Sequence, residues 1–246
     1  MAQGGVNELD GLFGKFNISG NEDKLDTMWN TVLNHGYGYS ELGGSLAKTT
    51  YLVCKIDSVP KPIIKGNDQG THAEKQLMNN LKEMTPPKNK VTVYINNSPC
   101  ADCALILKTY LKKNKGIHLT LYVTHLYNIR RMSCEMGAKK NEGHMKFIKE
   151  NEHEANYQGL RDLISLGDNR CKIEAFTEDV WRELHEVMGL TEDCQQRMIT
   201  YAETKITDPK NKAKNHDRSR KTEDINIKND LIHLQKNVDP WHEIKK

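Results

Sequence analysis

Between positions 49 and 188, the spacing of the apolar residues alternates between every second residue and every third or fourth. A spacing of two is typical of strands, and a spacing of three to four is typical of helices. The pattern therefore predicts an α/β fold in which crossover helices connect the strands of a mixed sheet. The predicted strands cover 49–56, 61–65, 91–95, 119–123 and 173–176, and the predicted helices cover 26–33, 72–84, 157–164, 194–206 and the stretches that follow Pro99 and start near Glu178.

The formal net charge of +3 lies entirely near the C-terminus. Positions 1–203 carry 25 Lys and Arg against 26 Asp and Glu, whereas positions 205–246 carry 11 against 7. The basic stretch has few apolar residues, so it can bury too little surface to fold by itself. We expect a basic, flexible tail at 207–246, with an electrostatic arm for nucleic acid or a nuclear address as the alternative interpretation.

The rest of the chain fits one domain. We expect a flexible N-terminus at 1–20 and a domain at 21–206, interrupted at 133–156 by a polar insertion or extended loop. No stretch approaches the roughly 18 apolar residues of a membrane-spanning helix, and the N-terminus does not look like a secretion signal. Six cysteines in 246 residues are too few for a disulfide scaffold. We therefore expect a cytoplasmic or nuclear location without a membrane, where thiols are available for a metal or for packing.

Two short motifs stand at the starts of neighbouring predicted helices. The first is His72-Ala73-Glu74, the second is Pro99-Cys100-Ala101-Asp102-Cys103, and 24 residues lie between them. Two cysteines three apart at a helix start present both sulfurs to one side, and the helix amides favour their thiolate forms. With His72 they supply three ligands for Zn²⁺ and leave a fourth position open, as catalytic zinc sites do.

A zinc-bound water ionises near neutral pH, so such a site can hold hydroxide. Glu74 is placed to take a proton from that water and pass it to a ring nitrogen and a departing amine. The matching reaction is hydrolytic deamination of a nucleobase. A structural zinc site or a redox pair is the alternative, and the loosely placed candidates for a fourth structural ligand are Cys54, Cys134, Cys171 and His125.

The sequence also resembles the AID/APOBEC polynucleotide cytidine deaminases. The likeness rests on TTYLVC at 49–54, HAE at 72–74, SPCADCA at 98–104 and LY at 126–127, and it runs to about position 188. Ala-Asp between the cysteines is particularly similar to the lamprey branch, and divergent invertebrate relatives match comparably. The resemblance implies a cytidine-deaminase-like three-layer fold, with a five-stranded mixed sheet, about six flanking helices and the last two strands parallel.

Residue roles follow from the same resemblance, position by position. It implies the zinc ligands His72, Cys100 and Cys103 and the proton shuttle Glu74. The residues implied to bind the target nucleotide are Thr50, Asn67, Ala73, Ser98 and Tyr127. Those implied to contact the strand or to read the base 5′ of the target are Lys48, His125, Asn128, Arg130 and Arg131. The zinc-bound hydroxide would attack C4 of cytosine while Glu74 moves the protons.

One departure affects the pocket. The family's usual Ser-Trp-Ser before Pro-Cys is Asn96-Asn97-Ser98 in this chain, so an aromatic floor is missing. Stacking of a base on an aromatic ring contributes about 1–3 kcal/mol to binding. Without that ring, we expect either weaker activity or a changed orientation of the cytosine in the pocket.

We expect cytosine in single-stranded DNA as the substrate, because a duplex hides the reactive carbon and the helix before the last strand leaves a groove open for a polymer. The alternatives are an RNA, adenine or nucleoside deaminase, and a nucleic-acid-binding protein that keeps the zinc and the fold without turnover.

Overall fold

The computed structural model describes residues 50–68, 70–84, 89–131, 148–189, 192, 196 and 220–236. The expected flexible N-terminus, the helix expected at 26–33 and Lys48 lie outside the described residues. So do most of the 133–156 insertion and nearly all of the helix expected at 194–206.

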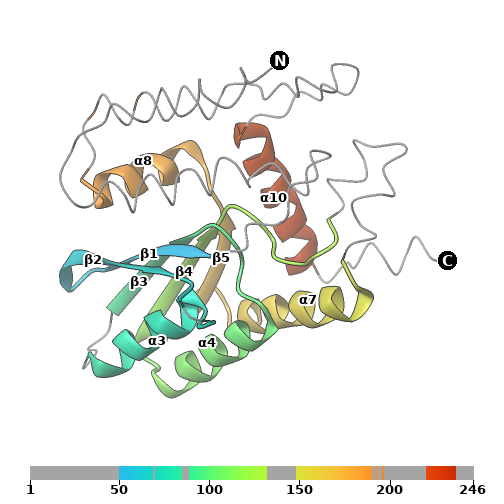
Figure 1. Cartoon of the computed structure of the whole chain (residues 1–246), viewed down its shortest axis with the longest axis horizontal. Helices are drawn as coiled ribbons and strands as arrows, with labels where there is room; N and C mark the ends of the chain where they lie inside the picture. The colour runs from blue at the N-terminus through green and yellow to red at the C-terminus, as the bar shows by residue number, and fades with distance from the viewer. Residues whose placement is uncertain are drawn as a thin grey trace, which may run out of the picture.

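The centre of the molecule is a five-stranded sheet in the order β2-β1-β3-β4-β5 (Figure 1). Strand β1 pairs antiparallel with β2 and β3, and the β3–β4 and β4–β5 pairs are parallel, which confirms the predicted parallel last strands. The strands are β1 Tyr51–Ile56, β2 Val59–Gly66, β3 Asn89–Ile95, β4 Ile117–Val123 and β5 Cys171–Ala175.

Strand β2 starts earlier than its sequence pattern predicts, and the reason is its place in the sheet. It begins at Val59, so it includes Pro60 and Pro62, which interrupt the strand pattern in the sequence. A proline cannot donate to a neighbouring strand, and β2 pairs on only one side because it is an edge strand. Its exposed side therefore tolerates both prolines.

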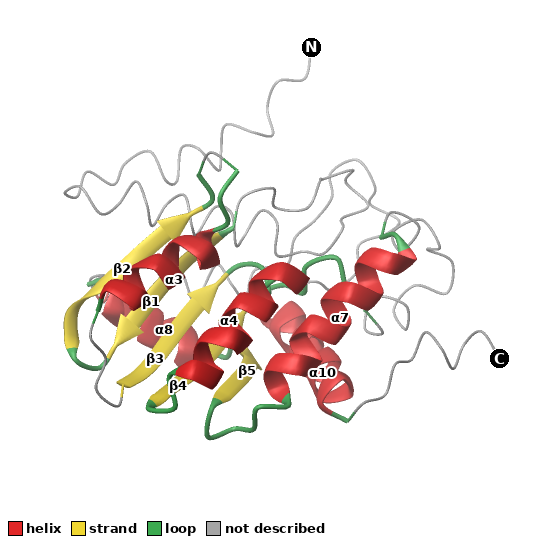
Figure 2. Cartoon of the chain, turned by 90° about the horizontal axis from the view of Figure 1, so that it is seen from below, coloured by secondary structure: helices red, strands yellow, loops and turns green. Residues whose placement is uncertain are grey.

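Helices cover both faces of the sheet and so make three layers. Figures 1 and 2 show α3, α4 and α7 on one face and α8 on the other. Side chains alternate accordingly along β1, where Leu52 and Cys54 belong to the larger core cluster and Val53 belongs to the cluster that contains Trp181 of α8. The helices are α3 Ala73–Glu83, α4 Ala101–Lys113, α7 Glu150–Ile164, α8 Glu178–Val187 and α10 Arg220–Gln235, which makes five among the described residues.

Helix α10 contradicts the expectation of a flexible tail after position 206. Its apolar residues Ile227, Leu231 and Leu234 are at most 2% exposed and join the larger core cluster, and the helix contacts β5 and α7. The sequence interpretation was wrong here because the apolar stripe is diluted by charged residues, and its burial depends on elements far away in the chain. The folded core therefore includes part of the predicted tail.

The predicted limits of the insertion also need correction. Helix α7 begins at Glu150, so the last seven positions of 133–156 belong to it. The residues at 150–156 are polar for two reasons. Glu150 and Glu152 lie in the first turn, where carboxylates interact favourably with the helix dipole. His153 and Asn156 are buried and make hydrogen bonds to other segments.

Candidate metal-binding active site

Three strand ends meet at one edge of the sheet and bring the predicted site residues together. Gly66 at the end of β2 pairs with Tyr51 at the start of β1, and Ile95 at the end of β3 pairs with the next residue, Leu52. Val123 at the end of β4 pairs with Ile95. The segments that leave these three strands contain the HAE motif, the PCADC motif and the loop of Tyr127, so all three gather at this edge.

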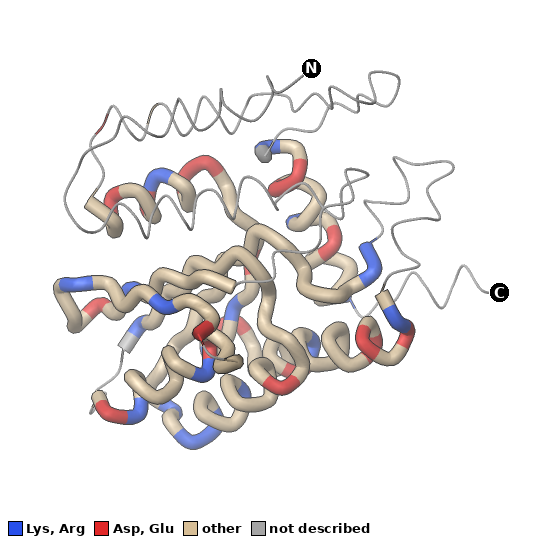
Figure 3. Tube along the Cα trace, in the orientation of Figure 1, with Lys and Arg blue, Asp and Glu red and all other residues tan. Residues whose placement is uncertain are grey.

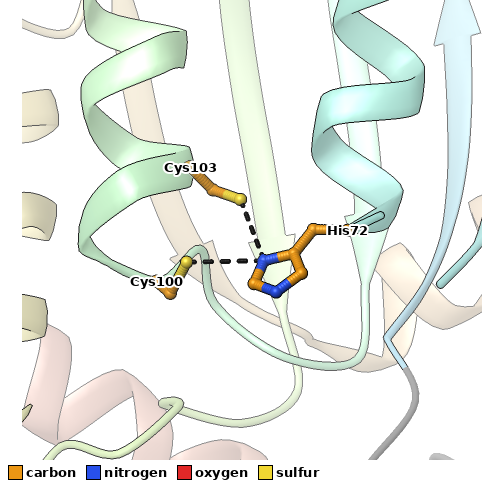
Figure 4. Close-up of side chains that lie close together, drawn as sticks. All are labelled: His72, Cys100 and Cys103. Atoms are coloured by element: carbon orange, nitrogen blue, oxygen red, sulfur yellow. Dashed lines mark hydrogen bonds between the residues drawn. The ribbon is translucent and has the colours of Figure 1, made fainter. Parts of the chain in front are cut away.

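The three expected metal ligands form one cluster at the starts of α3 and α4 (Figure 4). His72 is the N-cap of α3, Cys100 is the N-cap of α4, and Cys103 lies in the first turn of α4. Nδ1 of His72 lies 3.3 Å from Sγ of Cys103 and 3.5 Å from Sγ of Cys100, and all three donor atoms lie within 4.8 Å of one another.

This geometry fits zinc. A tetrahedral ion with ordinary Zn–N and Zn–S bond lengths holds its nitrogen and sulfur ligands about 3.5 Å apart. The two measured separations match that value, and two thiols with one imidazole are a common donor set for zinc. His72, Cys100 and Cys103 would hold the ion, and no other such group of donors is found among the described residues.

The two thiols are electrostatically unequal. The pKa of Cys100 is lowered, chiefly because the Cys103 thiol donates a hydrogen bond to it, and the neighbouring His72 acts in the same direction. The pKa of Cys103 is raised by that same hydrogen bond and by burial. Of the other described cysteines, Cys54 and Cys171 have their pKa raised to about 12 by burial, so they are packed thiols.

Glu74 lies beside the cluster in the first turn of α3 and is only 5% exposed. Burial raises the pKa of its carboxyl to about 7, and the negative charge at Cys100 adds to this effect while the charge at His72 opposes it. Its Oε2 has no hydrogen-bond partner among the described residues. The site therefore contains a carboxyl group able to exchange protons beside the three donors.

Thr50 and Asn67, both implied to bind the nucleotide, lie at this same edge. Oδ1 of Asn67 accepts a 2.9 Å hydrogen bond from the backbone N–H of Ala73, the first residue of α3, and its own N–H donates to the Thr50 carbonyl at 2.9 Å. Nδ2 of Asn97 donates to Oγ1 of Thr50 at 3.2 Å. Asn97 is 1% exposed, so the residue that replaces the aromatic floor is buried and tied to the start of β1.

Ser98 and Tyr127 link the PCADC motif to the loop after β4. The N–H of Ser98 donates to the His125 carbonyl at 2.7 Å, and Oγ of Ser98 accepts from the N–H of Tyr127 at 2.9 Å. The pKa of Tyr127 is raised by burial and by the negative charges of Cys100, Glu152 and Glu74. Tyr127 therefore lies in the same part of the molecule as Cys100 and Glu74.

Two residues expected to contact nucleic acid, Arg131 and His125, have buried side chains. Arg131 is 3% exposed, and its guanidinium makes ion pairs with Glu223 and Asp230 of α10. His125 is 4% exposed. Both side chains are buried, and that of Arg131 is held by carboxylates, so a contact of this pair with nucleic acid stays a prediction.

The other residues of this loop are less buried. Nε and Nη2 of Arg130 donate to the carbonyl of Ile148 at 3.3 and 3.0 Å. Asn128 has a positive φ of 48°, which asparagine tolerates better than most residues, and its Nδ2 donates to Glu152 at 3.4 Å. Both side chains are partly exposed.

Sequence reasoning missed the contribution of α7. Nδ1 of His153 accepts a 3.2 Å hydrogen bond from the N–H of Arg130, and Oδ1 of Asn156 accepts a 2.8 Å bond from the N–H of Ala101. Nothing in the sequence marks either residue, because their partners lie 23 and 55 residues away.

Comparison with known proteins identifies the fold around this centre. Residues 46–155 match the family model described as APOBEC3, cytosine deaminase domain. This part of the chain is AID/APOBEC-like. It is also 38% identical over 74 residues to the C->U-editing enzyme APOBEC-2 of Mus musculus. The matched part covers 29% of this AID/APOBEC-like chain and 33% of the mouse protein, so it spans about a third of that relative.

The match to the family model and the parallel β3-β4-β5 arrangement together confirm the predicted cytidine-deaminase-like α/β fold. Among the described residues of this AID/APOBEC-like chain, no helix has the length and apolar character needed to cross a membrane.

Proposed function

We propose that this AID/APOBEC-like chain is a zinc-dependent hydrolase that converts cytosine to uracil in single-stranded DNA. The observation that carries the proposal is the position of Glu74, a buried carboxyl with a raised pKa beside His72, Cys100 and Cys103. A purely structural zinc site needs a closed set of ligands and has no use for such a group.

His72, Cys100 and Cys103 would hold the zinc ion, which would supply an activated water for attack on C4 of cytosine. Glu74 would take one proton of that water and give it to N3 of the base, and would then take the second proton from the hydroxyl formed at C4 and give it to the departing amine, which leaves as ammonia. Water and cytosine are consumed, and uracil and ammonia are formed. Because Glu74 is not a metal ligand in this scheme, its carboxyl stays available for both transfers.

The substrate contacts follow from the residues gathered at the sheet edge. Thr50, Asn67, Ala73, the main chain of Ser98 and the ring of Tyr127 would surround the flipped nucleotide. Asn128 and Arg130 would face the neighbouring nucleotides, and Lys48 is proposed for the same strand from the sequence alone. Figure 3 shows Lys and Arg interspersed with Asp and Glu along the described chain, so we expect modest binding that weakens strongly with salt.

Incubation of the purified chain with an oligonucleotide that contains one cytosine tests the proposal, with uracil as the measured product. Glu74→Gln preserves the shape of the side chain and Glu74→Ala removes it. Both should lower the rate by about 10²–10⁴, because proton transfer is lost. Zinc content measured in the same preparations should be unchanged. Full activity of Glu74→Ala would refute the mechanism.

The same oligonucleotide assay separates the substrates. DNA, RNA and free cytidine of equal cytosine content are compared side by side, together with matched adenine substrates. Single-stranded DNA should give the highest kcat/KM. A higher value for RNA or for the free nucleoside would keep the zinc chemistry and change the proposed substrate.

Asn97 favours a second candidate, a nucleic-acid-binding protein without turnover. Its buried amide lies where the family has an aromatic floor, so stacking on the target base would be weaker. This candidate predicts salt-sensitive binding of single strands with no uracil formed on any of them. Detection of uracil that depends on Glu74 would exclude it.

A further inference from the structure

The N-cap residue of α4, the helix that contains both cysteines, makes no side-chain capping hydrogen bond. Cys100 stands at the N-cap of α4, but its side chain makes no capping hydrogen bond, because Sγ faces Nδ1 of His72 instead. The first backbone N–H groups of a helix have no partner within the helix, and a cysteine engaged with a metal is unsuited to accept from them. The start of α4 therefore needs an acceptor from elsewhere.

Asn156 supplies that acceptor from the middle of α7. Its Oδ1 accepts a 2.8 Å hydrogen bond from the N–H of Ala101, the first residue of α4, and Asn156 is 6% exposed. One turn further along α7, a Cβ on Gly159 would lie 3.1 Å from Cα of Ala101 and 3.2 Å from Cβ of Ala104. Helix α7 thus lies directly against the first turn of α4, at the residues between and after the cysteines.

The other ligand-bearing helix uses the same device. His72 is the N-cap of α3 and also makes no capping bond, and Oδ1 of Asn67 accepts from the N–H of Ala73 instead. Asn67 is six residues from its partner, whereas Asn156 is 55 residues away. The position of α4, and with it the position of both sulfurs, therefore depends on the packing of a separate helix.

We propose that Asn156 is a positioning residue for the metal centre, which holds the start of α4 so that Cys100 and Cys103 face His72 at zinc-binding separation. The proposal rests on the zinc site of the proposed function. It predicts that loss of the Asn156 acceptor weakens metal binding itself, beyond any general loss of stability. Hydrogen-bonded groups outside the ligand set commonly alter metal affinity by about 10–100-fold.

Zinc affinity of the full-length protein, measured by competition with a chromogenic chelator, tests the proposal. Asn156→Ala and Asn156→Leu both remove the acceptor, and Leu keeps a side chain of similar size in case the Ala variant folds poorly. Both should bind zinc about 10-fold more weakly or worse. Asn156→Asp keeps an oxygen that accepts from the Ala101 N–H, so its affinity should stay at or above that of the wild type.

Ile173→Val provides the control for stability, because it shortens a buried side chain on β5 and leaves the start of α4 intact. Its zinc affinity should equal that of the wild type. Co²⁺ bound in place of zinc adds a spectroscopic signature, since its absorption reports thiolate ligation, and this should change in Asn156→Leu and be retained in Asn156→Asp.

The outcomes are separable. Wild-type zinc affinity in both Asn156→Ala and Asn156→Leu would overturn the role of Asn156 while the zinc site stands. A loss of zinc affinity in Ile173→Val equal to that in the Asn156 variants would also overturn it, because reduced stability alone would then explain the weaker binding. Failure of the wild-type chain to bind zinc at all would refute the proposed zinc site itself.

Discussion

Arg131 and Asp230 are 99 residues apart in the sequence, and Nε of the arginine donates a 2.7 Å hydrogen bond to Oδ2 of the aspartate. Nη1 of the same guanidinium pairs with Glu223, and all three side chains are at most 6% exposed. This buried ion cluster ties α10 to the loop that follows β4, which also contains Tyr127. The C-terminal helix is therefore coupled to the loop beside the metal centre.

Arg131→Met should lower the free energy of unfolding by about 3–5 kcal/mol, because it leaves buried carboxylates without their cation. Urea denaturation measures the change. Lys55→Met is the matched control, since its pair with Glu183 is about 40% exposed on both sides and should contribute less than about 1 kcal/mol. Equal effects of the two substitutions would mean that the Arg131 cluster contributes no more than a surface pair.

Helix α10 offers an internal comparison between a buried and an exposed apolar residue. Leu231→Ala should cost about 2–5 kcal/mol of unfolding free energy, because Leu231 is 2% exposed in the core. Ile225→Ala, on the same helix but 55% exposed, should change stability by less than about 0.5 kcal/mol. Chemical denaturation of both variants measures the difference. Indistinguishable midpoints would show that α10 does not pack on the core in solution.

His185 should make the fold sensitive to mild acid. Burial lowers its pKa from 6.5 to about 4, and the charge of Arg182 acts in the same direction. Below pH 6.5 the unfolded chain binds a proton at His185 that the folded chain does not bind until about pH 4, so this residue's contribution to stability is full above 6.5 and falls as the pH falls toward 4.

The measurement is the unfolding free energy of wild type and His185→Gln at several pH values. Between neutral pH and about pH 5, the wild type should lose about 2 kcal/mol more than the variant, because pH 5 lies about 1.5 units below the ordinary pKa of 6.5 and each unit costs about 1.4 kcal/mol at this one group. Parallel pH profiles for the two proteins would contradict the prediction.

The described cysteines should differ in reactivity toward a thiol reagent. Cys100 is partly exposed at the site, whereas Cys54 and Cys171 are at most 1% exposed in the core. In metal-free protein, Cys100 should be modified first, and added Zn²⁺ should protect it, because a ligating thiolate is no longer available. Mass-spectrometric peptide mapping with and without Zn²⁺ measures this. Modification of Cys54 before Cys100, or no protection by Zn²⁺, would contradict the assignment of the ligands.

The metal-site residues could be predicted from the sequence because they lie within short motifs at helix starts. The spacing of Cys100 and Cys103 is a property of one helical turn, and His72 precedes another helix. The strand directions then bring both helix starts to one edge. Alternating apolar residues predicted the strands of the sheet for a similar reason, since their period is local.

The roles of Arg131, His153 and Asn156 could not be predicted in this way. An arginine in the loop after β4 is as suitable for a phosphate as for a carboxylate, and the choice depends on α10, which begins 89 positions further along the chain. Likewise, the side-chain amide of Asn156 can accept a hydrogen bond from the N–H of Ala101 only when α7 packs against α4. The residues next to these positions in the sequence do not indicate which distant residues will contact them in the folded chain.

The residue order was thus sufficient to predict the cluster of His72, Cys100 and Cys103 with Glu74 beside it, since these depend on spacing within a few turns, whereas the parallel end of the sheet was implied by the resemblance. The docking of α10, the burial of Arg131 and the support that Asn156 gives to α4 depend on packing between distant segments. A polar side chain in such a place is stable only when folding brings its partner within hydrogen-bond distance, and that distance is a property of the assembled core.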